Sequence, residues 1–155
     1  MSEPWPYDLP IFRRAHRATS PDGKVEAAIA QAVEITMGNP TTGTLELSTG
    51  LALDRCSPSF LWSHDSRYLA VPRYVLRLGL FRRHRMVVID VVERRALAAP
   101  EIAFHYQPES FSDGILVATK EPFNSATRVT WRIPAALATF RRVAMRAAGG
   151  AGSRR

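Results

Sequence analysis

The sequence is poor in cysteine and lysine and has no long uncharged apolar run. Its 155 residues include one cysteine, Cys56, so no internal disulfide can form and no oxidising compartment is required. The longest apolar candidate, "YLAVPRYVLRLGLF", is interrupted by Arg73 and Arg77 and falls short of the roughly 18 uncharged residues of a membrane span. The first residues carry acid and proline instead of the basic start and apolar run of a signal peptide. We therefore expect a cytoplasmic protein that does not engage a membrane.

The sequence also lacks the local motifs of common catalytic and cofactor sites. "SHDS" (63–66) contains serine, histidine and aspartate, but neighbours in one tight turn do not reach the geometry of a nucleophilic triad. No glycine-rich phosphate loop is present, and no histidine pair has metal-ligand spacing. The four histidines are His16, His64, His84 and His105. A carboxylate pair formed by distant residues stays open, because its separation depends on the fold. We expect no enzymatic activity, no cofactor and no metal.

Positive charge is what the sequence has in excess. The net charge is +7, and arginine supplies almost all of the positive charge, since Lys24 and Lys120 are the only lysines. This balance favours an acidic partner such as nucleic acid or an anionic surface. A genome whose codon usage favours arginine and alanine would give the same balance, so charge alone does not identify a partner.

Three basic segments place arginines beside a phenylalanine: "FRRAHR" (12–17), "FRRHR" (81–85) and "TFRR" (139–142). Convergence of the three on one face would suit single-stranded nucleic acid, because guanidinium groups hold phosphates and rings stack on bases. The alternative is that the phenylalanines anchor in the core while the arginines solvate loop and helix ends. No recognised RNA- or DNA-binding motif accompanies these segments.

A short turn pattern recurs along the chain. In "ATSPDGKVEAAIA" (18–30), "LWSHDSRYLAV" (61–71) and "SFSDGILVAT" (110–119), serine and aspartate precede a small residue and then an apolar run. The turn aspartates are Asp22, Asp65 and Asp113. Aspartate accepts hydrogen bonds from nearby backbone amides, and a small residue tolerates the positive φ of a tight reversal. The intervals between the turns are those of blade-sized β repeats.

Two predicted strands follow each turn. The strands directly after the turns are Val25–Ile35, Tyr68–Val75 and Ile115–Thr119. The second strands, reached after a loop, are 43–50, 85–95 and 127–133. Leu45 and Leu47 alternate with polar residues in the first of these, and Val129, Trp131 and Ile133 share one face of the last.

"SPDGK" (20–24), and "WSHDSRYLAVP" (62–72) followed by "RMVVIDVVERR" (85–95), resemble the repeat of TolB-like and WD40-like β-propellers. The resemblance covers residues 17–133 in three units and implies propeller-like blades. Three units are fewer than the four to eight blades of a closed ring. We therefore predict an all-β fold, an antiparallel meander of propeller-like repeats arranged as open twisted sheets or a sandwich.

The two ends of the chain differ from its middle. Residues 1–10 contain three prolines and predict an extended arm, and 149–155 predicts a flexible tail. "PAALATFRRVAMRAA" (134–148) changes to helical spacing and predicts a short C-terminal helix, with Leu137, Phe140 and Ala144 on one face. Residues 1–148 are predicted to form one domain.

The second repeat is extended by the basic stretch 73–85. Interpreted as a loop, this stretch exposes an amphipathic patch of the kind that binds partners. Interpreted as a continued strand, it places Tyr74, Leu76, Leu78 and Leu80 on one buried face. The candidate partner-binding residues are Arg73, Tyr74, Arg77, Phe81, Arg82, Arg83 and Arg85.

The function expected from these features is a non-catalytic protein-interaction module of adaptor or immunity type. An incomplete set of blades leaves sheet edges that must be paired or covered, which calls for a partner protein or a homo-oligomer. Nucleic-acid binding through the Arg/Phe clusters is the alternative.

Overall fold

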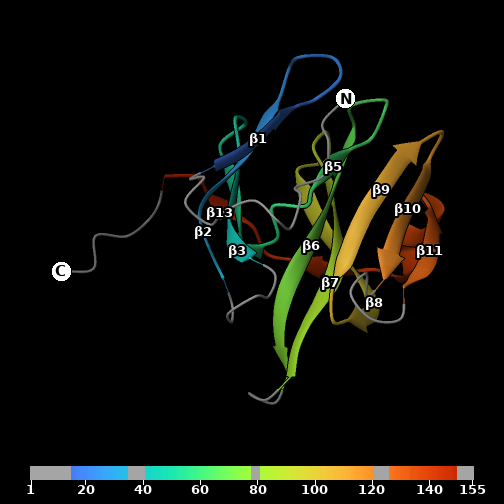
Figure 1. Ribbon diagram of the computed structural model, residues 1–155. Coiled ribbons are helices and arrows are strands. Elements are labelled where there is room, and N and C mark those ends of the chain that lie inside the picture. The colour runs from blue at the N-terminus through green and yellow to red at the C-terminus, as the bar shows by residue number, and fades with distance from the viewer. Residues whose placement is uncertain (1–14, 35–40, 78–80, 121–125, 150–155) are drawn as a thin grey trace.

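A computed structural model describes residues 15–34, 41–77, 81–120 and 126–149 (Figure 1). This part of the chain is all-β, with antiparallel strands in open sheets and one 3-10 helix. The first four strands are β1 (Ala15–Thr19), β2 (Glu26–Glu34), β3 (Thr41–Leu47) and β4 (Leu51–Cys56). The next four are β5 (Leu61–Trp62), β6 (Tyr68–Arg77), β7 (Phe81–Asp90) and β8 (Arg95–Ala103). The remaining elements are β9 (Tyr106–Ser112), β10 (Ile115–Lys120), β11 (Thr127–Arg132), the 3-10 helix η1 (Ala135–Thr139), β12 (Arg141–Val143) and β13 (Arg146–Ala147).

The strands form three successive antiparallel meanders. The larger sheet has the order β1-β2-β3-β4-β6-β7-β8-β12, with β5 on β6 and β13 on β4, and the smaller sheet has the order β11-β10-β9. Strands β4 and β6 are joined by one residue pair, Cys56 with Arg73. The larger sheet therefore divides into a first meander (β1–β4) and a second meander (β5–β8), and β9–β11 form the third. The six predicted strands correspond to β2, β6, β10, β3, β7 and β11.

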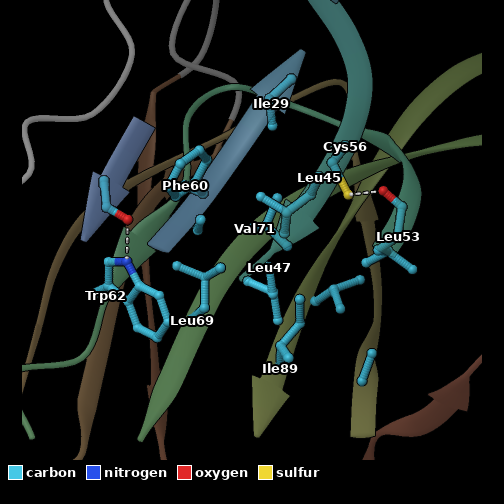
Figure 2. Packing of buried hydrophobic residues seen from close by; sticks show 14 of the residues in the cluster. Ile29, Leu45, Leu47, Leu53, Cys56, Phe60, Trp62, Leu69, Val71 and Ile89 are labelled. Atoms are coloured by element: carbon cyan, nitrogen blue, oxygen red, sulfur yellow. Dashed lines mark hydrogen bonds between the residues drawn. The ribbon is translucent and has the colours of Figure 1, made fainter. Parts of the chain in front are cut away.

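Two hydrophobic cores separate the three meanders. The first core lies between the first and second meanders, where Ile29, Leu45 and Val71 meet (Figure 2). The second core lies between the second and third meanders and contains Tyr106 and Trp131, whose rings are 5.8 Å apart. Side chains of the second meander alternate between the two cores, because successive residues of a strand point to opposite faces.

The first Ser-Asp turn connects β1 to β2 through a compact set of hydrogen bonds. The Ser20 hydroxyl donates to Asp22 Oδ1 (2.6 Å) and accepts from the amide of Val25 (3.1 Å). The Asp22 carboxylate also accepts from the amide of Lys24 (3.0 Å), and Gly23 has a φ of 75°. The bonds from Ser20 and then from Lys24 hold the pKa of Asp22 below its ordinary value.

The second turn, between β5 and β6, repeats this arrangement. The Ser63 hydroxyl donates to Asp65 Oδ1 (2.6 Å) and accepts from the amide of Tyr68 (2.9 Å). Ser66 takes the positive φ, at 66°, and its hydroxyl accepts from the amide of Asp22 (2.9 Å), so the two turns touch. The predicted recurrence of the turn is confirmed for these two copies.

The third predicted copy forms a different turn. Asp113 and Gly114 have φ values of 52° and 71° and make the two-residue connection of the β9–β10 hairpin, in which Ser112 pairs with Ile115. Here serine directly precedes aspartate, whereas one residue separates them in the first two turns. The segment therefore closes as a tight hairpin.

The prediction of a helix over 134–148 is wrong beyond its first turn. Only Ala135–Thr139 is helical, as a 3-10 helix, and the chain then forms β12 and β13. Leu137 and Phe140 are buried in the second core. Beyond Phe140 the backbone pairs with the edges of β8 and β4, and this distant pairing overrides the weak local helical pattern. The predicted arm over 1–10 and, apart from Gly149, the predicted tail over 149–155 lie outside the described residues.

The two outer faces of the three-layer stack are polar. On the outer face of the first meander, Arg17 pairs with Glu26 at 2.6 Å. On the outer face of the third meander, Arg128 pairs with Glu109 at 3.3 Å. Val92, in the turn between β7 and β8, is the one exposed large hydrophobic side chain among the described residues. Among the described residues, neither outer face therefore carries an exposed large hydrophobic side chain on which a further layer would pack.

Candidate functional site

A groove of about 400 Å³ opens where β6, β7, β8 and β12 meet. It lies on the face of the second meander that carries the first core, beyond the part that the first meander covers, because Val71, Arg73 and Val75 alternate along β6. The groove is lined by Arg73 and Val75 of β6, Arg85 and Val87 of β7, Ala98 and Ile102 of β8, and Arg141, Arg142 and Val143 of β12. The arginines and aliphatic residues thus share one surface.

Strand register brings like charges together in this groove. Arg73 of β6 lies directly opposite Arg85 of β7, and Arg85 in turn lies opposite Ile102 of β8. Like charges that face each other across an antiparallel pair are destabilising. Strand β12 adds Arg141, which pairs with Ala98 of the same sheet. The fold therefore concentrates positive charge at a position where it has an energetic cost.

The groove arginines lack carboxylate partners within the described part of the chain. None of the described residues that line the groove is acidic. The Nε of Arg73 donates to the backbone carbonyl of Asp54 (2.9 Å), and burial, followed by the charge of Arg55, lowers the pKa of Arg73. The Nε of Arg85 is buried without a hydrogen-bond partner. An anion in the groove would offset this concentration of positive charge.

The structure places the predicted partner-binding residues on a long hairpin. Of the two interpretations of 73–85, the continued strand is confirmed as far as Arg77 and the loop is wrong where the structure describes it, because β6 runs to Arg77 and β7 starts at Phe81 in continuous register. Arg73 and Arg85 line the groove, and Arg83 lies opposite Val75 on the same face. The hairpin extends below the neighbouring strands in Figure 1.

Among the predicted residues whose side chains the structure describes, Tyr74 does not line the groove. Tyr74 points to the opposite face, where its ring lies 5.8 Å from that of His84. Arg77, Phe81 and Arg82 occupy strand positions, and their side chains lie outside the described structure.

Sequence reasoning missed the contribution of β12 to this site. The sequence shows that the "TFRR" segment is basic, but its spacing predicts a helix. A helix would not pair with a strand, so the pairing of Arg141 and Arg142 with β8 was not predicted. The "FRRHR" and "TFRR" segments meet at the groove through Arg85 and these two arginines. Arg17, the described arginine of the first basic segment, is instead paired with Glu26.

The Ser-His-Asp turn has the contacts of a structural turn. Ser63 Oγ is engaged by Asp65 and by a backbone amide, and the amide of His64 donates to the carbonyl of Phe111 (2.9 Å). A second cleft, of about 380 Å³, lies between this turn and the β9–β10 hairpin. The rings of Tyr68 and Phe111 stack there at 6.1 Å.

Two histidines that are distant in the sequence, one on β7 and one between β8 and β9, have adjacent rings. His84 and His105 are buried, with ring centroids 4.6 Å apart, and His84 Nδ1 lies 2.7 Å from the carbonyl of Phe104. Burial lowers the pKa of His84 to about 4, and burial followed by His84 lowers the pKa of His105 well below its ordinary value. The described residues contain no group of three side chains that could hold a metal ion.

The single cysteine belongs to the first core. Cys56 is fully buried, and its thiol donates to the carbonyl of Leu53 at 3.3 Å (Figure 2). Burial raises the pKa of this thiol to about 12. Because the thiolate is the nucleophilic form, Cys56 is poorly suited to reaction and acts as a small core residue.

Comparisons with protein families, curated proteins and solved structures found no match to this chain. Within the described ranges, the chain forms no helix of the length and apolarity needed to cross a membrane.

Proposed function

We propose that this protein is a non-catalytic protein-interaction module whose groove binds an acidic segment of a partner protein. The observation that carries the proposal is the arginine-lined groove, in which Arg73, Arg85, Arg141 and Arg142 lie together without a carboxylate among the described lining residues. Charge-assisted hydrogen bonds from guanidinium groups to carboxylates are short and strong, and arginine is favoured as an interface anchor.

The aliphatic part of the groove favours a polypeptide over nucleic acid. Val75, Val87, Ile102 and Val143 lie among the arginines, and none of the described residues that line the groove is aromatic. Proteins that bind single strands rely on aromatic side chains on which bases stack. A peptide in which carboxylates are interleaved with aliphatic side chains would meet both kinds of lining residue. The nucleic-acid alternative therefore has weaker support from this surface.

The lining residues also favour binding without catalysis. Arginine stays protonated and aliphatic side chains carry no titratable group, so the described residues that line the groove supply no nucleophile and no general base. As part of the proposal, we place the protein in the cytoplasm, because its one cysteine is a buried free thiol.

We further propose that the fold derives from a propeller-type β repeat. The Ser-x-Asp turn joins the first two strands of both the first and the second meander, with matching hydrogen bonds. The polar outer faces support a three-layer unit that does not require further blades.

The test is a titration with a fluorescein-labelled synthetic peptide of glutamate and leucine residues, followed by fluorescence anisotropy. We expect wild-type protein to bind this acidic probe peptide more tightly than a matched peptide of lysine and leucine. The double variant Arg141→Glu/Arg142→Glu should lose at least about tenfold in affinity, because each charge-assisted contact contributes about 1.5–3 kcal/mol. Arg94→Glu/Arg132→Glu makes the same charge change at exposed positions away from the groove and should bind almost normally.

Two results would overturn the proposal. Equal binding of the acidic and basic peptides would show that charge complementarity does not operate in the groove. Tighter binding of a single-stranded oligonucleotide, lost in Arg141→Glu/Arg142→Glu, would assign the groove to nucleic acid instead.

A further inference from the structure

The C-terminal segment 141–148, termed the clasp below, lies on the outer edges of two meanders at once. Its strand β12 pairs with β8 of the second meander, and β13 pairs with β4 of the first. The amide of Ala148 then donates to the carbonyl of Gly50 (2.9 Å). Apart from the clasp, strand pairing joins these two meanders at a single residue pair, Cys56 with Arg73. The clasp is therefore a second connection between them.

The clasp is also one wall of the arginine groove. Arg141, Arg142 and Val143, all on β12, are three of the residues that line it. Without a docked clasp, the groove would lose this wall and two of its four arginines. Val143 and Met145 pack against the first core but remain partly exposed.

One ion pair, between Arg146 of β13 and Asp54 of β4, contacts the C-terminal strand of the clasp. The Nε and Nη2 of Arg146 donate to the Oδ2 and Oδ1 of Asp54, at 3.0 and 2.9 Å. The hydroxyl of Thr44 donates to the same carboxylate (2.9 Å) and helps to orient it. The hydrogen bond from Arg146 is the largest cause of a lowered pKa at Asp54. The pair is partly exposed, so its contribution is modest, but β12 and β13 contribute only a few residue pairs and the bidentate contact adds a side-chain anchor to their docking.

We infer that partner binding in the groove is coupled to docking of the clasp, with Asp54 and Arg146 as positioning residues. This inference rests on the proposed function of the groove. A partner that binds only when the clasp is docked shifts the equilibrium between undocked and docked clasp toward the docked form. By linkage, a substitution that weakens docking of the clasp also weakens partner binding. Neither Asp54 nor Arg146 lines the groove.

The direction in which Asp54→Asn changes the affinity for the acidic probe peptide distinguishes coupling from electrostatics alone. Asp54 is negatively charged and close to the groove, since its backbone carbonyl accepts from Arg73. Electrostatics alone predicts that removing this charge tightens binding of an acidic peptide. Coupling predicts the reverse, because the neutral amide no longer forms the bidentate ion pair with Arg146.

The experiment measures the affinity of the acidic probe peptide for Asp54→Asn, Arg146→Gln and the charge-swapped Asp54→Arg/Arg146→Asp. We expect each single variant to lose at least about fivefold in affinity. The swapped pair should recover part of this loss at unchanged net charge. Glu93→Gln also removes one carboxylate, at an exposed turn position that does not line the groove, so it is the matched control and should bind nearly as wild type does.

Hydrogen exchange read by mass spectrometry follows the clasp itself. We expect the probe peptide to slow exchange over 141–148 in the wild-type protein, and Asp54→Asn to speed it before any peptide is added. Undiminished affinity in Asp54→Asn, with affinity lost in Arg141→Glu/Arg142→Glu, would overturn the coupling and leave the proposed function standing. Failure of the wild-type protein to bind the peptide would overturn both.

Discussion

Lowering the pH should destabilise this protein at pH values well above those at which carboxylates titrate. The reason is that His84 is buried in its neutral form. Its ring lies between Tyr74 and His105 and its Nδ1 is within hydrogen-bond distance of the carbonyl of Phe104. Burial lowers the pKa of His84 from 6.5 to about 4 in the folded state. Between these two values the unfolded chain binds more protons than the folded one, so the free energy of unfolding falls as the pH is lowered.

The size of the effect follows from the two pKa values of His84. Lowering the pH from about 7.5 to about 5 should remove about 2 kcal/mol of stability through this one group. His105 shifts in the same direction and adds to the loss. The lowered pKa values of Asp22 and Asp54 act in a more acidic range, since their stabilising contribution is lost only as the pH falls through their folded values.

The assay is urea unfolding at about pH 7.5 and about pH 5, at constant ionic strength, followed by tryptophan fluorescence. Trp62 and Trp131 are buried and will report the transition. His84→Asn keeps a donor for the carbonyl of Phe104 but does not titrate, so its stability should depend about 2 kcal/mol less on pH than that of the wild type. His64→Asn, at an exposed turn position, should keep the full dependence. Equal pH dependence in wild type and His84→Asn would refute this account of the buried ring.

Further predictions concern the turns. Ser63→Ala should lower the free energy of unfolding by about 1–3 kcal/mol, because a buried backbone amide of the next strand loses its acceptor; Ser20→Ala, in the more exposed first turn, should cost less in the same urea assay. Gly114→Ala should cost more than the roughly 1–2 kcal/mol of a left-handed alanine, because its Cβ would lie 2.7 Å from the carbonyl oxygen of Ile133. Gly23→Ala has open space around it and should show only the left-handed cost, so equal thermal shifts in the two glycine variants would contradict the steric part.

The sequence predicted the strands and turns that depend on residues close to one another in the chain. Alternation of Leu45 and Leu47 with polar residues predicts β3, and the Ser-x-Asp spacing predicts the first two turns. The third turn differed because serine stands one residue closer to Asp113, a difference that is visible in the sequence once the hydrogen bonds of the other turns are known. These features depend on local spacing, which one sequence contains.

The C-terminal region and half of the groove depend on contacts between distant residues. The spacing of Leu137 and Phe140 is shared by a helix and by a short 3-10 turn that buries both residues. The pairing of β12 with β8 and of β13 with β4 produces no periodic pattern in the amino-acid sequence. Arg141 and Arg142 could therefore not be assigned to the groove from the sequence. Arg73 and Arg85 were identified because both belong to the basic stretch 73–85, which the structure shows as part of the β6–β7 hairpin.

The role of the groove is tested most directly by a methyl NMR titration of the wild-type protein with the acidic probe peptide. Val75, Ile102 and Val143 line the groove on three different strands and carry methyl groups that report its occupancy. Binding as proposed predicts shifts concentrated at these three residues. Shifts confined to the outer faces of the first or third meander, or no shifts at saturating peptide, would contradict the assignment of this groove as the partner-binding site.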